Sequence, residues 1–299
     1  MDFISRTHRT PQIDMHYAAV GDPSKPLVIC LHGFPEFWVA WRGVMEALSD
    51  CYYLVAPDQR GFNLSSKPEG VDSYRAKHMV ADLASLADAL SPGRPFVLAG
   101  HDWGASVAYA YAFAHPDRLS SLVIANGVHP ACFQRAINDD EEQRAASQYI
   151  NRLRAADAEE LMSEDGFRRL FNMLAGFSRT SWMTDAVKRD YLDAWQQPGA
   201  LTAMLNWYRA SPIDVQVPGE PAPASKVLDI PVEALAVKMP HLVVWGEADE
   251  ALRPSCIDGL GTYAPDLTLR VVSGTGHWLL HERPAEVAAL IRDFLDRSG

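Results

Sequence analysis

Short apolar runs alternate with helical stretches along the first 127 residues of the chain. The runs are almost continuously apolar, each ends at a turn, and they lie at 26–33, 52–61, 95–102 and 119–127. Helical spacing of apolar residues fills the gaps between them, at 37–50, 75–90 and 105–115. Strands that are apolar throughout are typical of a parallel sheet covered by helices on both faces. The pattern therefore predicts an α/β core.

The alternation of strand and helix stops after Gly127. Residues 130–215 are mostly helical in pattern, and acidic residues around Asp140 indicate the start of one helix. The pair Pro198–Gly199 predicts a break between two further helices. A Pro-rich stretch with little periodicity follows at 212–240, and we interpret it as a linker back to the core.

The pattern of the first part of the chain returns near its end. Two further strands and a closing amphipathic helix are predicted at 241–249, 267–277 and 284–297. An α/β core interrupted by a helical insertion is the simplest architecture that accounts for this order. We expect a first part of the core, a helical cap with its linker, and a second part of the core, at 1–128, 129–238 and 239–299.

Composition and charge exclude several classes of function. The chain has 299 residues, of which 48% are hydrophobic, enough for one large core. Its formal net charge of −11 argues against nucleic acid or an anionic membrane as a partner. No apolar run approaches the ~18 residues of a membrane-spanning helix, and the N-terminus lacks a signal-peptide segment. We expect a cytoplasmic protein that acts on a small molecule, and the sequence leaves open whether it forms a homodimer.

The cysteines give no sign of a structural crosslink. There are four of them, and no two are close in sequence. This spacing predicts neither a disulfide framework nor a zinc site. Cys30 and Cys51 lie in apolar runs, so both are expected to be buried thiols.

The stretch LAGHDWGASVAYAYAFAHP, residues 98–116, has the layout of a nucleophile elbow, in which a strand turns sharply into a helix. Asp102 occupies the centre, where a serine is usual, and Gly100 and Gly104 lie two residues away on each side. Small residues there allow strand and helix to pack closely. A carboxylate at a helix N-terminus and at the carboxyl edge of a sheet faces the ligand in its ionised form. A helix N-cap is the structural alternative, but plain N-caps do not need flanking glycines.

Three further segments supply the partners of such a nucleophile. The His-Gly pair in LHGFPEFWVAW matches the loop that gives one N–H to an oxyanion hole. SGTGHWLLHERP places His277 on a loop between the last strand and the last helix. VVWGEADEALRPS places acids directly after the preceding strand, and Glu247, Asp249 and Glu250 all compete there, with Asp249 the best match to the spacing of the family that these segments resemble. A structural role is the better interpretation for three other histidines, His101, His115 and His281.

These segments resemble the α/β-hydrolase superfamily, which uses the same chain order of nucleophile, acid and histidine. The resemblance covers nearly the whole chain. Within the superfamily, HGFPEFWVAWR and GHDWGASVAY are similar to epoxide hydrolases. SQYINRL and LNWYRA resemble the segments that carry the two cap tyrosines of that family, which implies Tyr149 and Tyr208. Tyr191, the remaining tyrosine of the insertion, lies in KRDYLDAW, a context that indicates an ordinary helix face.

The resemblance implies an epoxide hydrolase that needs no metal or organic cofactor. Asp102 attacks an epoxide carbon and forms an alkyl ester, while Tyr149 and Tyr208 stabilise the leaving oxygen. His277, oriented by Asp249, then deprotonates the water that attacks the ester carbonyl.

Two further pairs of residues complete the expected site. The backbone N–H groups of Phe34 and Trp103 are expected to hold the oxyanion. The side chains of Trp38 and Trp207 are expected to line the substrate pocket.

Hydrolytic dehalogenases share an aspartate at the elbow and are the main alternative. Haloalkane dehalogenases usually place a halide donor directly after the His-Gly pair, where this chain has Phe34. Haloacetate dehalogenases usually place an arginine after the nucleophile, where this chain has Trp103. Both departures favour the epoxide hydrolase, although Trp103 and Trp207 are available as halide donors. The absence of Gly-x-Ser-x-Gly disfavours a serine esterase.

Overall fold

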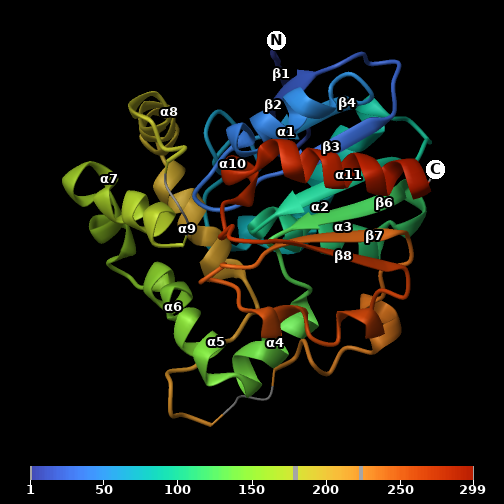
Figure 1. The fold of residues 1–299 in the computed structure, drawn as a ribbon. Helices are drawn as coiled ribbons and strands as arrows, with labels where there is room; N and C mark the ends of the chain where they lie inside the picture. The colour runs from blue at the N-terminus through green and yellow to red at the C-terminus, as the bar shows by residue number, and fades with distance from the viewer. Residues whose placement is uncertain (1, 178–180, 222–224, 299) are drawn as a thin grey trace.

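The computed structural model describes residues 2–177, 181–221 and 225–298, and a sheet of eight strands lies at its centre (Figure 1). The strands are β1 (Ile4–Arg9), β2 (Asp14–Val20), β3 (Leu27–Leu31), β4 (Tyr53–Pro57), β5 (Phe96–His101), β6 (Leu119–Ala125), β7 (His241–Gly246) and β8 (Leu267–Val272). Their order across the sheet is β1-β2-β4-β3-β5-β6-β7-β8. The strands from β3 to β8 pair in parallel, as the apolar runs predict.

The antiparallel edge of the sheet is not indicated by the apolar pattern. β1 pairs antiparallel with β2, which in turn pairs antiparallel with β4. The side chains of β1 are almost all exposed, so this strand has no apolar run. Because an edge strand has a neighbour on one side only and here little cover, hydrophobicity does not reveal it.

Helices cover both faces of the sheet, as predicted. One core joins the sheet to α1 and α11, and the other joins it to α2 and α3. Successive side chains of β5 enter opposite cores, Val97 on the α11 face and Leu98 on the α3 face. The helices of these layers are α1 (Arg42–Leu48), α2 (Ala76–Leu90), α3 (Trp103–Ala114), α10 (Leu279–Glu282) and α11 (Pro284–Ser298). Short 3₁₀ turns join the elements at η1 (Trp38–Trp41), η2 (Val71–Tyr74), η3 (Pro116–Arg118), η4 (Val232–Leu235), η5 (Pro254–Ile257) and η6 (Leu260–Thr262).

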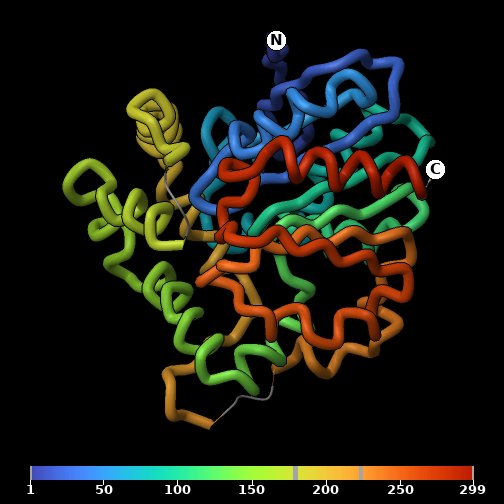
Figure 2. Tube along the Cα trace, in the orientation of Figure 1, coloured from blue at the N-terminus to red at the C-terminus, as the bar shows by residue number. Residues whose placement is uncertain are grey.

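The chain between β6 and β7 forms a helical segment, residues 130–235, called here the inserted segment. Its helices are α4 (Pro130–Asp139), α5 (Glu141–Ala146), α6 (Gln148–Arg154), α7 (Ala158–Gly176), α8 (Asp185–Trp195) and α9 (Ala200–Ala210). The Asp140 carboxylate caps α5 by accepting two main-chain N–H groups, and α8 and α9 are separated at Pro198–Gly199, as predicted. Helices α6 to α9 gather on one side of the sheet, and the C-terminus lies on the opposite side (Figure 2).

The Pro-rich stretch at 212–240 contains η4 within its described part, and its residues 222–224 lie outside the described residues, as do 178–180 of the helical stretch. The division of the chain at residues 128 and 238 stays a prediction. Among the helices that the structure describes, none is long and apolar enough to cross a membrane.

The expectation that both thiols in the early apolar runs are buried is half wrong. Cys30 is buried within β3, but Cys51 is exposed. Cys51 lies in the turn after α1. In this turn the side chains of Leu48 and Tyr52, and not that of Cys51, are buried in the core.

Candidate active site

Asp102 lies in the turn between β5 and α3, with φ of 50° and ψ of −121°. The flanking glycines make this turn compact. A Cβ on Gly100 would lie 2.6 Å from the carbonyl oxygen of Gly104, and one on Gly104 would overlap the carbonyl oxygen of Leu31. The Asp102 side chain makes no capping hydrogen bond to α3. The turn therefore has the geometry expected of an elbow, and the N-cap alternative does not hold.

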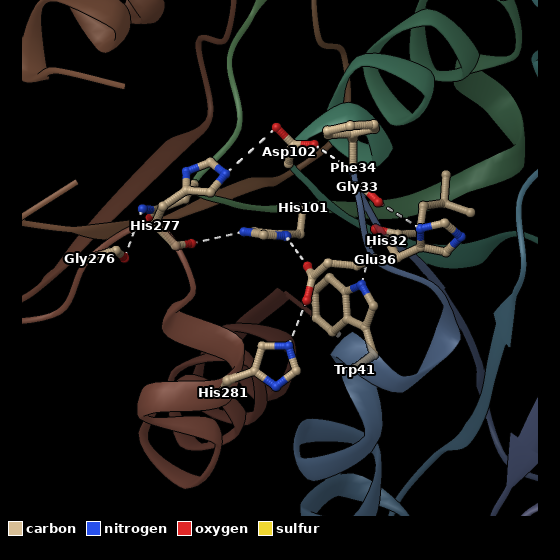
Figure 3. Close-up of polar contacts among 12 residues, drawn as sticks. His32, Gly33, Phe34, Glu36, Trp41, His101, Asp102, Gly276, His277 and His281 are labelled. Carbon is tan, nitrogen blue, oxygen red and sulfur yellow. Dashed lines mark hydrogen bonds and ion pairs between the residues drawn. The ribbon is translucent and has the colours of Figure 1, made fainter. Parts of the chain in front are cut away.

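The loop after β3 lies directly against the Asp102 carboxylate (Figure 3). The backbone N–H of Phe34 donates to Asp102 Oδ1 at 2.7 Å. A Cβ on Gly33 would overlap the Asp102 side chain, so this approach needs glycine. Trp103 is the first residue of α3, and an N–H at that position has no acceptor within its own helix. Of the two N–H groups predicted for the oxyanion hole, that of Phe34 thus contacts Asp102 across the fold, and that of Trp103 follows Asp102 directly in the sequence.

His277 lies between two carboxylates. Its Nδ1 is 2.8 Å from Asp249 Oδ2, and its Nε2 is 3.6 Å from Asp102 Oδ2. Of the three acids that the sequence left open, Asp249 is buried and reaches His277, whereas Glu247 and Glu250 are exposed. The structure therefore brings together Asp102, His277 and Asp249 in the arrangement that the sequence predicts.

Asn126, which the sequence analysis missed, holds this arrangement in place. Its side-chain amide donates to Asp249 Oδ2 at 2.6 Å and to the Gly276 carbonyl at 3.1 Å. Its amide oxygen accepts the N–H of Gly246 at 2.6 Å. The Asp249 carboxylate also accepts the N–H groups of Ala251 and Leu252. The position of Asn126 directly after β6 is the one signal in the sequence, since the ends of parallel strands meet at one edge.

The charges around His277 favour its protonated form. Burial alone would lower its pKa, but the Asp249 and Asp102 carboxylates outweigh burial and raise the pKa of His277 to about 10. With Asp102 ionised, His277 is therefore an imidazolium at neutral pH.

Tyr149 in α6 and Tyr208 in α9 reach the same place from the inserted segment. Both line two small cavities, of about 30 and 10 Å³, that also border Asp102. Their ring centroids are 6.2 Å apart, and the Tyr208 ring meets Phe34 edge-on at 5.0 Å. Burial, helped by the Asp102 charge, raises the pKa of both phenols well above the usual range. Both are consequently protonated and able to donate a hydrogen bond.

A larger cavity of about 240 Å³ adjoins the 30 Å³ cavity, with Trp103 and Ser106 in the shared wall. Its lining is almost entirely apolar and includes Trp207. The Trp207 indole N–H donates to the Arg60 carbonyl at 3.0 Å. The residues that line these cavities do not include Trp38.

The placement of Trp38 in the substrate pocket is not supported. Its ring packs on Phe3, with centroids 5.1 Å apart, and the Arg42 guanidinium lies over it at 5.0 Å. Trp38 opens η1, where the chain turns this indole toward the N-terminal residues instead of the cavity. Tyr191 also lies apart from Asp102, because its hydroxyl donates to the buried Glu36 carboxylate at 2.7 Å.

Residues 26–284 match the family model of the α/β-hydrolase fold. The chain is 32% identical to epoxide hydrolase 3 of Xenopus tropicalis, over 95% of this chain and 75% of that protein. The chain belongs to the epoxide hydrolase family of the α/β-hydrolase superfamily. It is also 35% identical to the AB hydrolase superfamily protein YfhM of Bacillus subtilis, over 96% of each chain.

Solved structures agree with this family. A structure from a study of novel epoxide hydrolases in metagenomes from hot environments has a TM-score of 0.90 and 35% identity, with 99% of each chain covered. The epoxide hydrolase of Bacillus megaterium in complex with an inhibitor has a TM-score of 0.87 and 27% identity, over 97% of this chain and 100% of that one. The inserted helices of this epoxide hydrolase family member are thus part of the shared fold.

Proposed function

We propose that this member of the family opens an epoxide to a vicinal diol through an alkyl ester on Asp102. The observation that carries the proposal is a carboxylate–histidine–carboxylate set that faces two protonated phenols across one cavity. The carboxylate can attack carbon, and the phenols can stabilise the oxygen that leaves. The relatives named as epoxide hydrolases support the same reaction.

In the first step, an Asp102 carboxylate oxygen forms a bond to one epoxide carbon while the bond from that carbon to the ring oxygen breaks. Asp102 is suited to attack because the Phe34 N–H fixes one of its oxygens. The ring oxygen would carry a developing negative charge, and Tyr149 and Tyr208 stabilise it and give it a proton. The product of this step is a β-hydroxyalkyl ester of Asp102.

The protons balance through His277. The tyrosine that loses its proton recovers one from the His277 imidazolium, which becomes neutral. Ester formation removes the Asp102 charge, one of the two charges that raise the pKa of His277, so neutral imidazole is favoured at that stage. Alkylation of Asp102 thereby generates the base that the second step requires.

In the second step, neutral His277 takes a proton from water, and the hydroxide attacks the ester carbonyl. The backbone N–H groups of Phe34 and Trp103 stabilise the oxyanion. As the oxyanion collapses, the bond from the carbonyl carbon to the alkyl oxygen breaks, and this oxygen takes the proton of the added hydroxyl group, which releases the diol and leaves Asp102 as a carboxylate. His277 is again an imidazolium beside two carboxylates, and the cycle is closed. The inserted segment acts in this scheme as a cap that carries the two acids.

The substrate that fits this site is an epoxide with an uncharged, apolar substituent. The 240 Å³ cavity beyond Trp103 would receive the substituent, and among its lining residues none is ionisable at neutral pH. A charged substituent would be buried there without a partner, which is unfavourable.

Halide displacement is the weaker alternative. Halide release needs N–H donors beside the attacked carbon, but Phe34 has no side-chain donor. Of the two tryptophans available from the sequence, the Trp103 side chain is hydrogen-bonded to Tyr208, and the Trp207 N–H is bound to the Arg60 carbonyl.

A panel of styrene oxide, bromoalkanes, fluoroacetate and a nitrophenyl ester tests the function. We expect diol from styrene oxide, no halide from the halogenated compounds and no nitrophenol. In heavy-oxygen water, a single turnover should label the Asp102 carboxylate before the product. Release of halide without diol formation, or label in the product alone, contradicts the proposal.

A further inference from the structure

Glu36 is a buried carboxylate that the proposed reaction does not use. It lies two residues after Phe34, and the groups around it come from three other parts of the active site. His101 directly precedes Asp102, His281 follows His277 by four residues, and Tyr191 belongs to α8 of the inserted segment. We call these four residues, Glu36, His101, Tyr191 and His281, the Glu36 cluster.

The two oxygens of Glu36 receive different partners. Oε1 is 2.6 Å from His281 Nε2 and accepts the Tyr191 hydroxyl at 2.7 Å. Oε2 is 3.3 Å from His101 Nδ1, in an ion-pair contact without hydrogen-bond alignment. Glu36 and His101 are both buried. The carboxylate is thus tied to the elbow and to the segment after His277 (Figure 3). The Tyr191 hydroxyl ties it to the inserted segment as well.

His101 connects Glu36 to the proposed base. Its Nε2 is 2.9 Å from the main-chain carbonyl of His277, which can only accept, so Nε2 donates. Its Nδ1 faces the Glu36 carboxylate, 3.3 Å from Oε2. Burial would raise the pKa of Glu36, but the histidine partners His281 and His101 outweigh it and hold the pKa below the usual range. The cluster therefore joins the Glu36 carboxylate to His281 and Tyr191 by hydrogen bonds and to His101 by a longer contact.

We propose that Glu36 is a positioning residue that sets the place of His277 relative to the Asp102 ester. Through His101, Glu36 fixes the backbone of His277. Through His281, Glu36 fixes the first helical turn after His277. Tyr191 extends the same support to α8. This inference rests on the proposed function, since it concerns the step in which His277 activates water. A small displacement of a general base lowers the rate on the order of 100-fold.

The test separates the two chemical steps with styrene oxide as the probe. Rapid-quench experiments and intact-protein mass spectrometry give the rate constant for alkylation of Asp102 and the rate constant for decay of the adduct. In Glu36→Leu, which removes both acceptors at similar volume, we expect decay to slow on the order of 100-fold and the adduct to accumulate. Alkylation should change far less, because the Phe34 N–H still holds Asp102. Glu36→Gln keeps an acceptor oxygen for His281 and Tyr191 and should restore most of the decay rate.

Two variants at the partners of Glu36 keep the test decisive if Glu36→Leu does not fold. His281→Phe keeps the ring that stacks on Trp182 and removes the donor to Glu36, and Tyr191→Phe removes one hydroxyl. Both should slow adduct decay more than alkylation. Tyr109→Phe is the matched control, since it also removes a buried hydroxyl bonded to a histidine, His241. It should lower the melting temperature without changing the ratio of the two rate constants.

The outcomes are distinct. A wild-type ratio of the two rate constants in the folded Glu36 and His281 variants overturns the positioning role, even if their melting temperatures fall. A ratio that also changes in Tyr109→Phe overturns it too, because the ratio would then follow stability. Failure of the wild-type protein to form any adduct with styrene oxide contradicts the proposed function instead.

Discussion

The sheet edge and the inserted segment contribute opposite kinds of group to one cavity. The sheet edge supplies charge, in Asp102, Asp249 and His277, and each of these side chains is fixed by hydrogen bonds or ion pairs. The inserted segment supplies the neutral phenols Tyr149 and Tyr208, which are placed by contacts between aromatic rings. In the proposed reaction, the sheet edge therefore supplies the group that attacks the epoxide carbon, and the inserted segment supplies the groups that stabilise the leaving oxygen.

The difference shows what a cap adds to this fold. Strand ends and helix N-termini favour anions, so the sheet edge can hold a nucleophile but is a poor place for an acid that must stay protonated. Burial under the inserted segment keeps the phenols protonated close to a carboxylate. Four changes break or sharpen this division.

The largest effect is expected at the nucleophile. Asp102→Asn or Asp102→Ala should lower diol formation by at least about 10⁴-fold, because Asp102 is the carboxylate among the residues that line the two cavities beside Tyr149 and Tyr208. The fold should be retained, which circular dichroism and the melting temperature measure. Substantial residual turnover would show that water attacks the epoxide directly and that the Asp102 carboxylate is not the attacking group.

The base is expected to act in the second half of the reaction. His277→Gln should form the ester on Asp102 and then fail to hydrolyse it, so an adduct equal in mass to the substrate accumulates. Intact-protein mass spectrometry after mixing with styrene oxide gives the measurement. Unmodified protein together with lost activity, when substrate binding is intact, would assign His277 to the first step.

The phenols are expected to act only in the departure of oxygen. Tyr149→Phe and Tyr208→Phe should each slow alkylation by up to about 100-fold, the usual effect of losing one transition-state donor. The double variant should be nearly inactive on epoxides, and the melting temperature should hold because the rings remain. Alkylation at the wild-type rate in the double variant would make both residues pocket walls and would favour halide displacement.

The smallest effect is on stability. The pKa of His277 is about 10 in the folded protein and about 6.5 unfolded, so its contribution is fully present below pH 6.5 and is lost as pH rises toward 10. The melting temperature should fall by a few degrees more over this interval in the wild type than in His277→Gln. Parallel profiles of the two proteins in differential scanning calorimetry would show that the charges at the sheet edge are not coupled to His277.

The sequence predicts much of this site because of where its residues stand. Asp102, Asp249 and His277 each follow a strand of strongly apolar pattern, and parallel strands deliver such residues to one edge. The roles of Asn126, Glu36 and His101 depend on contacts with residues far away in the sequence. An example is the hydrogen bond that the Gly246 N–H donates to the Asn126 side chain. Apart from the position of Asn126 directly after β6, nothing in the local pattern marks these roles, and from the sequence a structural role was the better interpretation for His101.

The direction in which a side chain points is also not predicted by the sequence. Trp38 and Trp207 both lie in helical turns near the site, yet one indole faces the N-terminal residues and the other lines the cavity. Spacing ranks the candidate acid partners of His277, but it is burial in the fold that distinguishes Asp249 from the exposed Glu247 and Glu250.

The backbone conformation of Asp102 has a consequence for protein engineering. A non-glycine residue at φ of 50° and ψ of −121° is held in a sparsely populated region, at a cost of roughly 1–3 kcal/mol. Glycine adopts such a conformation with little penalty, so a substitution by glycine that removes the proposed nucleophile would also relax the turn. A library of this enzyme selected for thermal tolerance alone would therefore enrich inactive clones at this position. Any directed-evolution scheme on this scaffold has to select for turnover and heat resistance in the same round.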